Sequence, residues 1–350
     1  MGLPCGTHNY TYAQDMAIMR TKTHWALLVG LLVLLYTCPL YLGNYWLGVS
    51  NLIGITVIAV IGLNILTGYC GQLSIGHAGF MAVGAYTIAI LTGTFKLPFL
   101  VGLISAGFMA GFVGLIFGIP SLKVKGFYLA IATIAAQFII IWVINHWSAM
   151  TGGFLGKSVP YASIGGVVFK SETSQFYLIM TIAVLCTYFA KNLTRTRIGR
   201  AFIAIRDNDL AAEVMGVNLF YYKLLAFFIG CFLAGIAGSL MAPWFGFIST
   251  ENFTLIDSIL FIGMLIIGGL GTTLGPILGV IFIRLLQQLI TFIAPLMERA
   301  FPAMPSAFSA GLAPMVFGLI IVLFLIFEPR GIAHRWVLFK AAYRLWPFSY

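Results

Sequence analysis

Long apolar stretches alternate with short polar segments along most of the chain. Most of these stretches come close to the length of about 20 residues that an α-helix needs to cross the hydrocarbon core of a bilayer. The alternation therefore predicts a chain that crosses a membrane many times as helices. The apolar stretches cover residues 25–42, 46–66, 72–91, 97–117, 126–144, 176–190, 224–243, 256–293 and 312–327.

The stretch 256–293 is too long for a single crossing of about 20 residues. Glycine, threonine and proline interrupt it near its middle, at Gly268, Gly269, Gly271, Thr272, Thr273, Gly275 and Pro276. We predict two spans that meet at a tight break there, which brings the total to about ten. A re-entrant segment in place of the shorter first half is the alternative.

The positions of Lys and Arg favour an even number of spans with both termini in the cytoplasm, because cytoplasmic loops carry an excess of these residues. The inner segments then hold Arg20, Lys22, Lys123, Lys125, the basic residues of 191–223, Arg330, Arg335, Lys340 and Arg344, and the outer ones hold Lys96, Lys157, Lys170 and Arg299. An odd number of spans would place the basic tail outside, against this bias.

The predicted fold class is an all-α polytopic membrane protein with about ten transmembrane helices, some of them broken, and a cytoplasmic coupling loop. We divide the chain into a cytoplasmic N-terminal segment 1–23, a transmembrane domain 24–328 and a basic amphipathic cytoplasmic tail 329–350. The transmembrane domain includes the loop 191–223.

Composition supports the membrane assignment and excludes other classes. Hydrophobic residues make up 61% of the chain, charged residues only 8%, and the mean hydropathy is +1.03, which is incompatible with a soluble domain of this length. The net charge of +10 does not indicate nucleic acid, because most Lys and Arg lie beside apolar stretches and fit membrane topology. The five cysteines are scattered and suggest neither a disulfide framework nor a metal site.

The loop 191–223 is the one long polar interruption. Asp207, Asn208 and Asp209 are good N-cap residues, 210–215 contains strong helix formers, and Gly216 supplies a C-terminal stop, so we predict a helix of about two turns. Such a short helix needs flanking structure or another protein to hold it. Two interpretations of this loop are consistent with the sequence: a docking site for another protein, and an ordinary basic juxtamembrane loop.

An amphipathic pattern lies just before this short helix. Ile198, Phe202 and Ile205 share one helical face while arginines supply positive charge, as in a helix that lies on anionic lipid headgroups. Membrane lipid is therefore an expected partner of this segment.

A few polar side chains fall within the predicted spans. Asn64, Gln72, Ser74 and His77 surround a glycine-rich break after the second span, where exposed backbone dipoles can bind a polar solute. Arg284 lies near the middle of the ninth span, where a cation usually faces a partner or water. We name these five as candidate residues of a translocation pathway. The alternative is structural, in which they satisfy freed backbone groups or join helices.

Several absences narrow the function. None of the nine acidic residues lies at mid-bilayer, which weakens proton-coupled transport but leaves sodium coupling open. The stretch 152–158 resembles a phosphate-binding loop, but the first glycine of that motif is replaced by Thr151. We find no metal-ligand spacing and no nucleophilic triad, so we expect no catalytic, cofactor-binding or metal-binding residues. The pattern favours a translocation pathway whose energy comes from a partner.

Residues 71–80, Gly-Gln-Leu-Ser-Ile-Gly-His-Ala-Gly-Phe, resemble the signature of the LivM-type permeases of branched-chain amino acid ABC transporters. Similar stretches follow in the family's order between residues 52 and 331, at 84–86, 126–133, 151–153, 197–201, 204–206, 211–216, 268–271, 274–276 and 327–331. This resemblance implies a permease subunit that imports leucine, isoleucine, valine or related small polar solutes across the bacterial inner membrane by alternating access. The chain itself is then no enzyme, and its partner subunits use the ATP.

The resemblance also implies the partners and the coupling residues. They are a homologous second permease of LivH type, two ATPases of LivG and LivF type, and a periplasmic substrate-binding protein. Permeases of this class dock on the ATPases through an EAA motif, whose spacing Ala211, Ala212 and Gly216 match, with Leu210 at the usual Glu position. The expected coupling residues are Arg206, Asp209, Ala211, Ala212, Glu213 and Gly216. A self-contained carrier or channel for a small solute, including urea or an amide, is the alternative.

Overall fold

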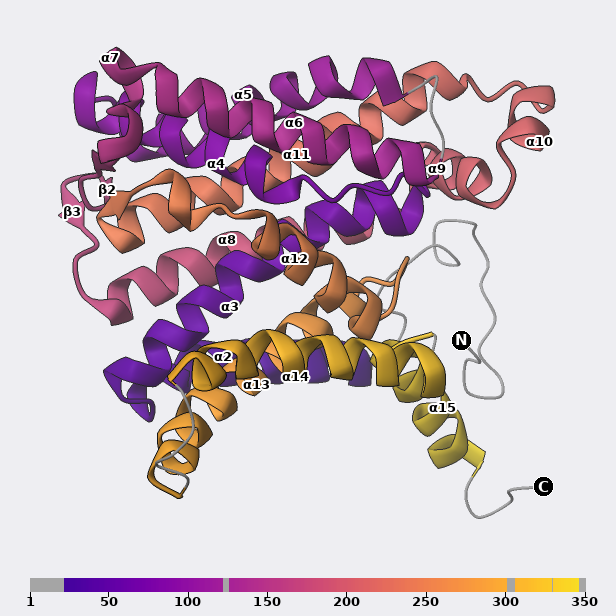
Figure 1. The fold of residues 1–350 in the computed structure, drawn as a ribbon. Helices are drawn as coiled ribbons and strands as arrows, with labels where there is room; N and C mark the ends of the chain where they lie inside the picture. Colours follow the sequence, from indigo (N-terminus) through magenta and orange to yellow (C-terminus); the bar gives the residue numbers. More distant parts are fainter. Residues whose placement is uncertain (1–21, 122–125, 301–305, 329, 346–350) are drawn as a thin grey trace.

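The structure is a computed structural model that describes residues 22–121, 126–300, 306–328 and 330–345. The predicted N-terminal segment 1–23 lies almost wholly outside these residues, as do Lys123 and Lys125. The described chain is almost entirely helical (Figure 1). Its helices are α2 (Lys22–Thr37), α3 (Asn44–Leu63), α4 (His77–Ile88), α5 (Phe99–Ser121), α6 (Phe127–His146), α7 (Ser148–Thr151), α8 (Glu172–Leu193), α9 (Arg197–Asp207), α10 (Asp209–Val214), α11 (Leu219–Phe245), α12 (Leu255–Gly268), α13 (Gly275–Ala300), α14 (Ser306–Phe327) and α15 (Ile332–Leu345).

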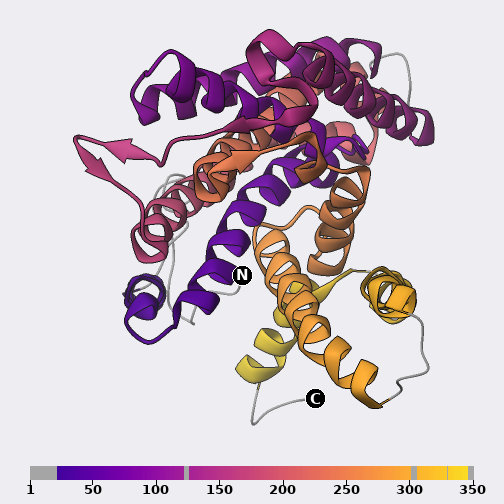
Figure 2. The same ribbon diagram turned by 60° about the vertical axis from the view of Figure 1, so that its left-hand side comes forward.

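Short irregular elements join these helices. Two π-helical turns, Asn64–Tyr69 and Ala89–Thr94, extend α3 and α4. Four two-residue strands, β1 (Lys157–Ser158), β2 (Ser163–Ile164), β3 (Val167–Val168) and β4 (Phe247–Ile248), form two antiparallel pairs. In the first pair Lys157 lies opposite Ile248, and in the second Ser163 lies opposite Val168. Figure 2 shows the β2–β3 hairpin projecting from the bundle.

The helices confirm a polytopic membrane protein but not the count of ten spans. Among the described residues, 7 helical segments are long and apolar enough to cross a membrane, or 8 if the bent pair α14 and α15 forms one span. The predicted first span is a shorter apolar helix, 25–40. The predicted third span contains α4, which has only 12 residues because the chain stays non-helical from Gly71 to Gly76. The predicted break in 256–293 is confirmed, since α12 ends at Gly268 and α13 begins at Gly275.

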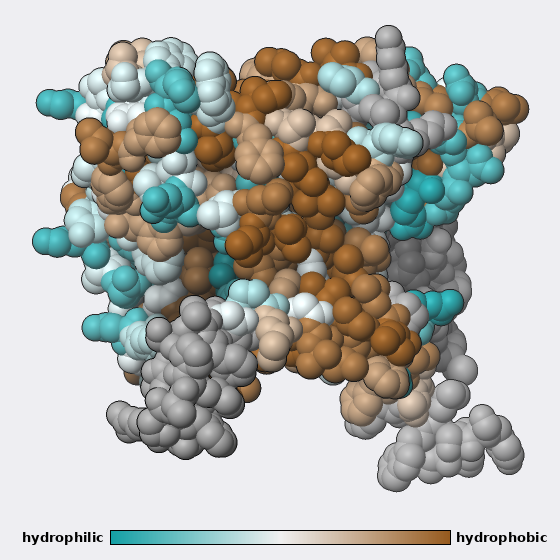
Figure 3. Space-filling view, viewed as in Figure 1, coloured by the Kyte–Doolittle hydropathy of each residue, from teal (hydrophilic) through white to brown (hydrophobic). Residues whose placement is uncertain are grey.

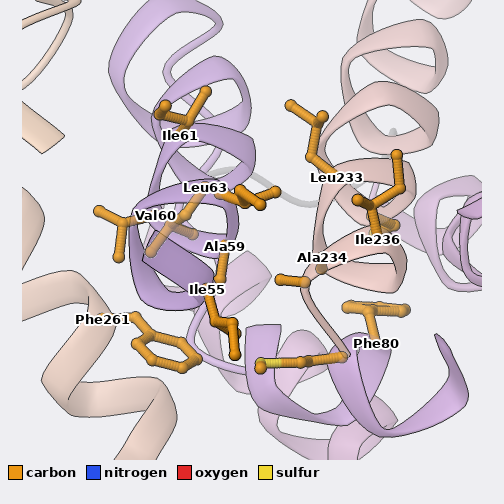
Figure 4. Close-up of a cluster of buried hydrophobic side chains, with 14 of the residues drawn as sticks. Ile55, Ala59, Val60, Ile61, Leu63, Phe80, Leu233, Ala234, Ile236 and Phe261 are labelled. Carbon is orange, nitrogen blue, oxygen red and sulfur yellow. The ribbon is translucent and has the colours of Figure 1, made fainter. Parts of the chain in front are cut away.

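The core lies where α3, α4 and α11 meet, with α5, α8 and α12 packed around them. Figure 4 shows Ile55, Ala59 and Leu63 of α3 facing Leu233 and Ala234 of α11. Nearly every side chain of α3 from Gly54 onward is buried. Apolar side chains on the outer helices instead form a broad brown band between more polar ends (Figure 3), as a bilayer requires.

Glycines bring these helices into backbone contact. A Cβ at Gly84 of α4 would lie 2.2 Å from the carbonyl oxygen of Gly235 in α11, and a Cβ at Gly238 would lie 1.9 Å from that of Met81. Lipid tails give no hydrophobic drive for helix association, so close backbone approach is a main source of packing energy. The contacts at Gly84 and Gly238 therefore join α4 and α11 directly through their backbones.

The contact at Gly238 can be tested with Gly238→Ala. We expect the added methyl group to force α4 and α11 apart and to destabilise the bundle by about 1–3 kcal/mol, the usual cost of overpacking. The measurement is the thermal unfolding midpoint of the chain in nanodiscs. Gly318→Ala in α14 is the matched control, because no heavy atom lies within 4 Å of its added Cβ. Equal midpoints for both variants would contradict the close contact.

Candidate translocation and coupling site

The polar segment between α8 and α11 folds into two helices at one end of the bundle (Figure 1). Thr196 is the N-cap residue of α9, and its side chain accepts a hydrogen bond from the Gly199 amide. The apolar face predicted for this segment is present, but Phe202 and Ile205 are buried against the protein core. The expectation that this face lies on lipid headgroups is wrong for these two residues, because the bundle itself covers them.

The short helix α10 has the ends that the sequence predicts. Of the three N-cap candidates, Asn208 is the N-cap residue in the structure, because its Oδ1 accepts a 3.0 Å hydrogen bond from the Ala211 amide. Gly216 has φ +87°, a conformation that favours glycine, and the Val217 amide donates to the Ala212 carbonyl at 2.9 Å. Ala212 is buried, and Asp209 pairs with Lys223 of α11 at 3.7 Å. These contacts hold α10 in place.

The opposite face of α10 is apolar and exposed. Leu210, Val214 and Met215 are 67%, 87% and 84% exposed, and the helix projects from the bundle (Figure 1). Ala211 and Glu213 are also exposed. An apolar surface on a protruding polar loop is typical of a protein interaction site. Leu210, which lies where the resemblance implies a Glu, belongs to this surface.

Arg206 connects this segment to the first helix break. Its Nη1 donates a 3.1 Å hydrogen bond to the Gly68 carbonyl in the π-helical turn, and its Nη2 pairs with Asp207 at 2.9 Å. Gly71, with φ +73°, packs closely on it, since a Cβ there would lie 3.0 Å from Arg206 Cγ. The π-helical turn that follows α3 therefore contacts the C-terminal end of α9.

Asn64 connects the first break to the second. Its Nδ2 donates to the Thr272 carbonyl at 2.8 Å, and its Oδ1 accepts from the Gly271 amide at 2.9 Å. From α8, Lys191 Nζ donates to Thr273 Oγ1 of the same loop at 3.0 Å. We call this cluster the inner junction: Gly68, Asn64, Arg206, Lys191 and the loop 269–274. It ties the polar segment to both breaks, and it occupies both hydrogen-bonding atoms of the Asn64 amide.

Gln72, Ser74 and His77 are buried around the first break. His77 Nε2 donates to the Ala59 carbonyl of α3 at 3.0 Å. The remaining polar atoms, Gln72 Oε1, Ser74 Oγ and His77 Nδ1, have no hydrogen-bond partner among the described residues. Buried polar atoms are normally paired. Each of these three side chains therefore has an atom free to form a further hydrogen bond, whereas both amide atoms of Asn64 are already paired.

Three polar residues that the sequence analysis did not select support the start of α4. Ser258 of α12 accepts from the Ala78 amide at 2.9 Å and donates to Gln137 Oε1 of α6 at 2.7 Å. Thr133 of α6 accepts from the Ile75 amide at 2.9 Å. The only sequence signal for these residues was the isolated polar pair Thr133 and Gln137, four positions apart in an apolar helix.

Arg284 does not join this cluster. Its Nη2 donates to Thr56 of α3 at 2.9 Å and its Nη1 to Gln287 of its own helix at 3.0 Å, while Nε has no partner among the described residues. The structure thus gives Arg284 an interhelical contact between α13 and α3. No three His, Cys, Asp or Glu side chains of the described residues gather as a metal site would require.

The role of Asn64 in the inner junction can be tested with Asn64→Leu. The substitution leaves the part-buried Gly271 amide and Thr272 carbonyl without their partner, and the cost of a fully buried unpaired group, about 1–3 kcal/mol, is the upper limit for each. We expect a lower thermal unfolding midpoint in nanodiscs. Asn44→Leu is the control, since Asn44 is exposed at the start of α3. An unchanged midpoint for Asn64→Leu would show that the two breaks do not depend on this side chain.

Comparisons with known proteins agree with this architecture. Residues 45–325 match the family described as branched-chain amino acid transport system / permease component. The chain is 32% identical over 286 residues to the high-affinity branched-chain amino acid transport system permease protein LivM of Escherichia coli, covering 75% of this chain and 67% of that protein.

More distant relatives show the breadth of the similarity. The probable branched-chain amino acid transport permease protein LivM of Methanocaldococcus jannaschii is 27% identical over 67% of each chain. The autoinducer 2 import system permease protein LsrC of Salmonella typhimurium is 25% identical, over 70% of this chain and 65% of that protein. No solved structure was found to match. The chain belongs to the family of permease components of branched-chain amino acid transport systems.

Proposed function

We propose that this chain is a permease subunit of an ATP-binding cassette importer that carries leucine, isoleucine, valine or related small polar solutes. The family membership and the names of its relatives support the substrate class. The observation that carries the coupling role is the exposed apolar face of α10, held on a segment that hydrogen-bonds to both helix breaks. The chain has no catalytic or cofactor role in this proposal, and the ATP is bound by partner ATPases.

The inner junction supplies a route for coupling. Closure of an ATPase pair moves α10, and Arg206 and Lys191 pass this displacement to Gly68 and Thr273, one in each break. Because Asn64 joins the two breaks, both respond together. Of the expected coupling residues, Ala211, Glu213 and Gly216 lie at the docking surface, whereas Arg206, Asp209 and Ala212 fix its position.

The translocation pathway in this proposal passes the first break. Gln72, Ser74 and His77 offer polar atoms that the described protein leaves unpaired, which suits a transient contact with a zwitterionic solute. Alternating access exposes them to one side and then the other as a homologous second permease moves against this chain. A periplasmic binding protein delivers the solute to the outer face.

The proposed orientation follows from charge. The segment that carries α9 and α10 is rich in Arg and Lys, so we place that end in the cytoplasm of a bacterial cell, with the chain in the inner membrane. α15 lies at the same end (Figure 1), consistent with a cytoplasmic C-terminus. We place the N-terminus on the cytoplasmic side as well.

The decisive experiment is uptake of labelled leucine into proteoliposomes. One set contains this chain alone and the other contains it with its second permease, ATPases and binding protein, each with and without internal ATP. We expect uptake only in the complete mixture with ATP, and competition by isoleucine and valine. Uptake by the chain alone would contradict the proposal and make it a carrier or channel.

The docking surface can be tested with Val214→Glu. We expect at least tenfold weaker co-purification of the ATPases and a matching loss of ATP-driven uptake, because a charge replaces an apolar contact at an interface, while thermal stability stays unchanged. Val167→Glu is a matched control, since Val167 is a 62% exposed valine on β3 at the opposite end of the bundle. Full ATPase binding by Val214→Glu would exclude α10 as the docking surface.

A further inference from the structure

Arg284 is a cation in the membrane domain that has only neutral partners. It lies in the middle of the apolar span Gly275–Ile293. Its Nη2 donates to Thr56 Oγ1 of α3 at 2.9 Å and its Nη1 to Gln287 Oε1 at 3.0 Å. No Asp or Glu of the described residues forms an ion pair with it. A cation at this depth normally pairs with an anion or faces water, so its positive charge is available to a ligand.

A carboxylate lies at the same level on the neighbouring helix. α12 and α13 pack antiparallel on either side of their break, and backbone contacts fix their register, with Gly268 against Gly275 and Met264 against Gly279. Continued along the pair, this register brings Arg284 to within one turn of Asp257 in α12. Asp257 is also close enough to interact electrostatically with Arg284.

The charge of Asp257 is not neutralised either. Its Oδ2 accepts hydrogen bonds from the amide and the hydroxyl group of Thr254, at 2.9 and 2.7 Å, while its Oδ1 accepts none from the described residues. Asp257 and Arg284 form no ion pair, and both side chains are half-buried. Two opposite charges thus lie on adjacent helices, and each keeps some surface that the described chain does not cover.

A polar face extends from Arg284 along α13, away from the break. Its members recur at helical spacing and are half-buried or exposed: Arg284, Gln287, Gln288 and Thr291. Tyr45 of α3 donates to Gln288 Oε1 through its hydroxyl group. Polar side chains within membrane helices face the bundle interior or water, not lipid. This face therefore offers a polar solute a route to Arg284.

Both charged residues flank the start of α4, beside the first break. Thr56, which binds Arg284, lies one turn from Ala59 on α3, and the Ala59 carbonyl accepts from His77 at 3.0 Å. Ser258, which follows Asp257, accepts from the amide of the second residue of α4 at 2.9 Å. The two charges therefore adjoin the part of the chain that the proposed translocation pathway passes.

We propose that Arg284 and Asp257 form a binding site for a zwitterionic amino acid, in which Arg284 binds the carboxylate and Asp257 binds the ammonium group. A guanidinium group can bind a carboxylate through two N–H donors, and an ammonium group donates to a carboxylate. A single counter-ion would neutralise one of the two charges, whereas an amino acid neutralises both. This inference rests on the proposed transport of amino acids and adds which residues recognise which group.

The test is equilibrium dialysis of three labelled ligands against the full chain co-purified with its partner subunits in nanodiscs, without ATP or binding protein. Leucine carries both charged groups, 3-methylbutylamine keeps only the ammonium group, and 4-methylpentanoate keeps only the carboxylate. Empty nanodiscs correct for partitioning into lipid. We expect leucine to bind at least tenfold more tightly than either analogue. An analogue that binds as tightly as leucine would overturn the site.

Variants assign each charged group to its residue. Arg284→Gln should weaken binding of leucine and 4-methylpentanoate at least tenfold, which is about 1.4 kcal/mol, and leave 3-methylbutylamine within twofold. Asp257→Asn should weaken leucine and 3-methylbutylamine and leave 4-methylpentanoate within twofold. Asparagine keeps an acceptor for Thr254, so Asp257→Asn tests the site even if Arg284→Gln does not assemble.

The matched controls are Arg200→Gln on α9 and Glu251→Gln in the 3₁₀ turn Thr250–Asn252, because both residues are exposed. We expect both controls to bind all three ligands as the unmodified chain does. An equal loss of all three ligands in Arg284→Gln and Asp257→Asn would show a structural role only. Unchanged binding in Arg284→Gln, with weaker co-purification of the second permease, would assign Arg284 to the subunit interface instead.

The outcome is separable from that of the uptake experiment. Group-specific binding that depends on Arg284 and Asp257, in a complex without ATP-driven uptake, would support the site and refute the importer. ATP-driven leucine uptake at the unmodified rate by both variants, with no group-specific change in dialysis, would refute the site and leave the importer intact.

Discussion

A broken helix inside a membrane must find partners for its freed backbone groups within the protein, because lipid offers none. In this chain the requirement is met by side chains from distant segments. Asn64 supplies a donor and an acceptor to the loop after α12, and Arg206 supplies a donor to the π-helical turn after α3. Ser258 and Thr133 accept from the amides at the start of α4. Each break is thus held by residues that also fix its position relative to another helix.

This constraint explains why the polar segment between α8 and α11 is so closely integrated with the membrane domain. A cytoplasmic loop that only carried charge would have no reason to bury Phe202 and Ile205. Here α9 is packed against the bundle so that Arg206 reaches Gly68, and α10 is left with an exposed apolar face. The same segment therefore packs on the protein on one side and leaves apolar side chains exposed on the other.

Local signals in the sequence predicted much of this fold. The apolar runs, the glycine-rich break after α12 and both ends of α10 depend on neighbouring residues, and each is present in the structure. The start of α4 was missed, because the predicted third span begins at residue 72, whereas the glycine-rich and partly polar segment 71–76 is not helical. The buried face of α9 was also missed, since the same amphipathic pattern suits a lipid surface and a protein core. Ser258 had no distinguishing signal, because its pairing with Gln137 arises only when α6 and α12 meet.

The glycine contacts divide the described bundle into parts that differ in how they can move. α3, α4 and α5 meet α11 backbone to backbone at Gly62, Gly84 and Gly235, and α12 meets α13 in the same way at Gly279. Such contacts leave no side chain to change rotamer, so each set behaves as one block. The two blocks share one apolar core, and they are also joined by hydrogen bonds through Asn64, Ser258 and Arg284. The seam between the blocks is therefore the place where polar contacts, which can exchange partners, take over from the close backbone contacts that hold each block together.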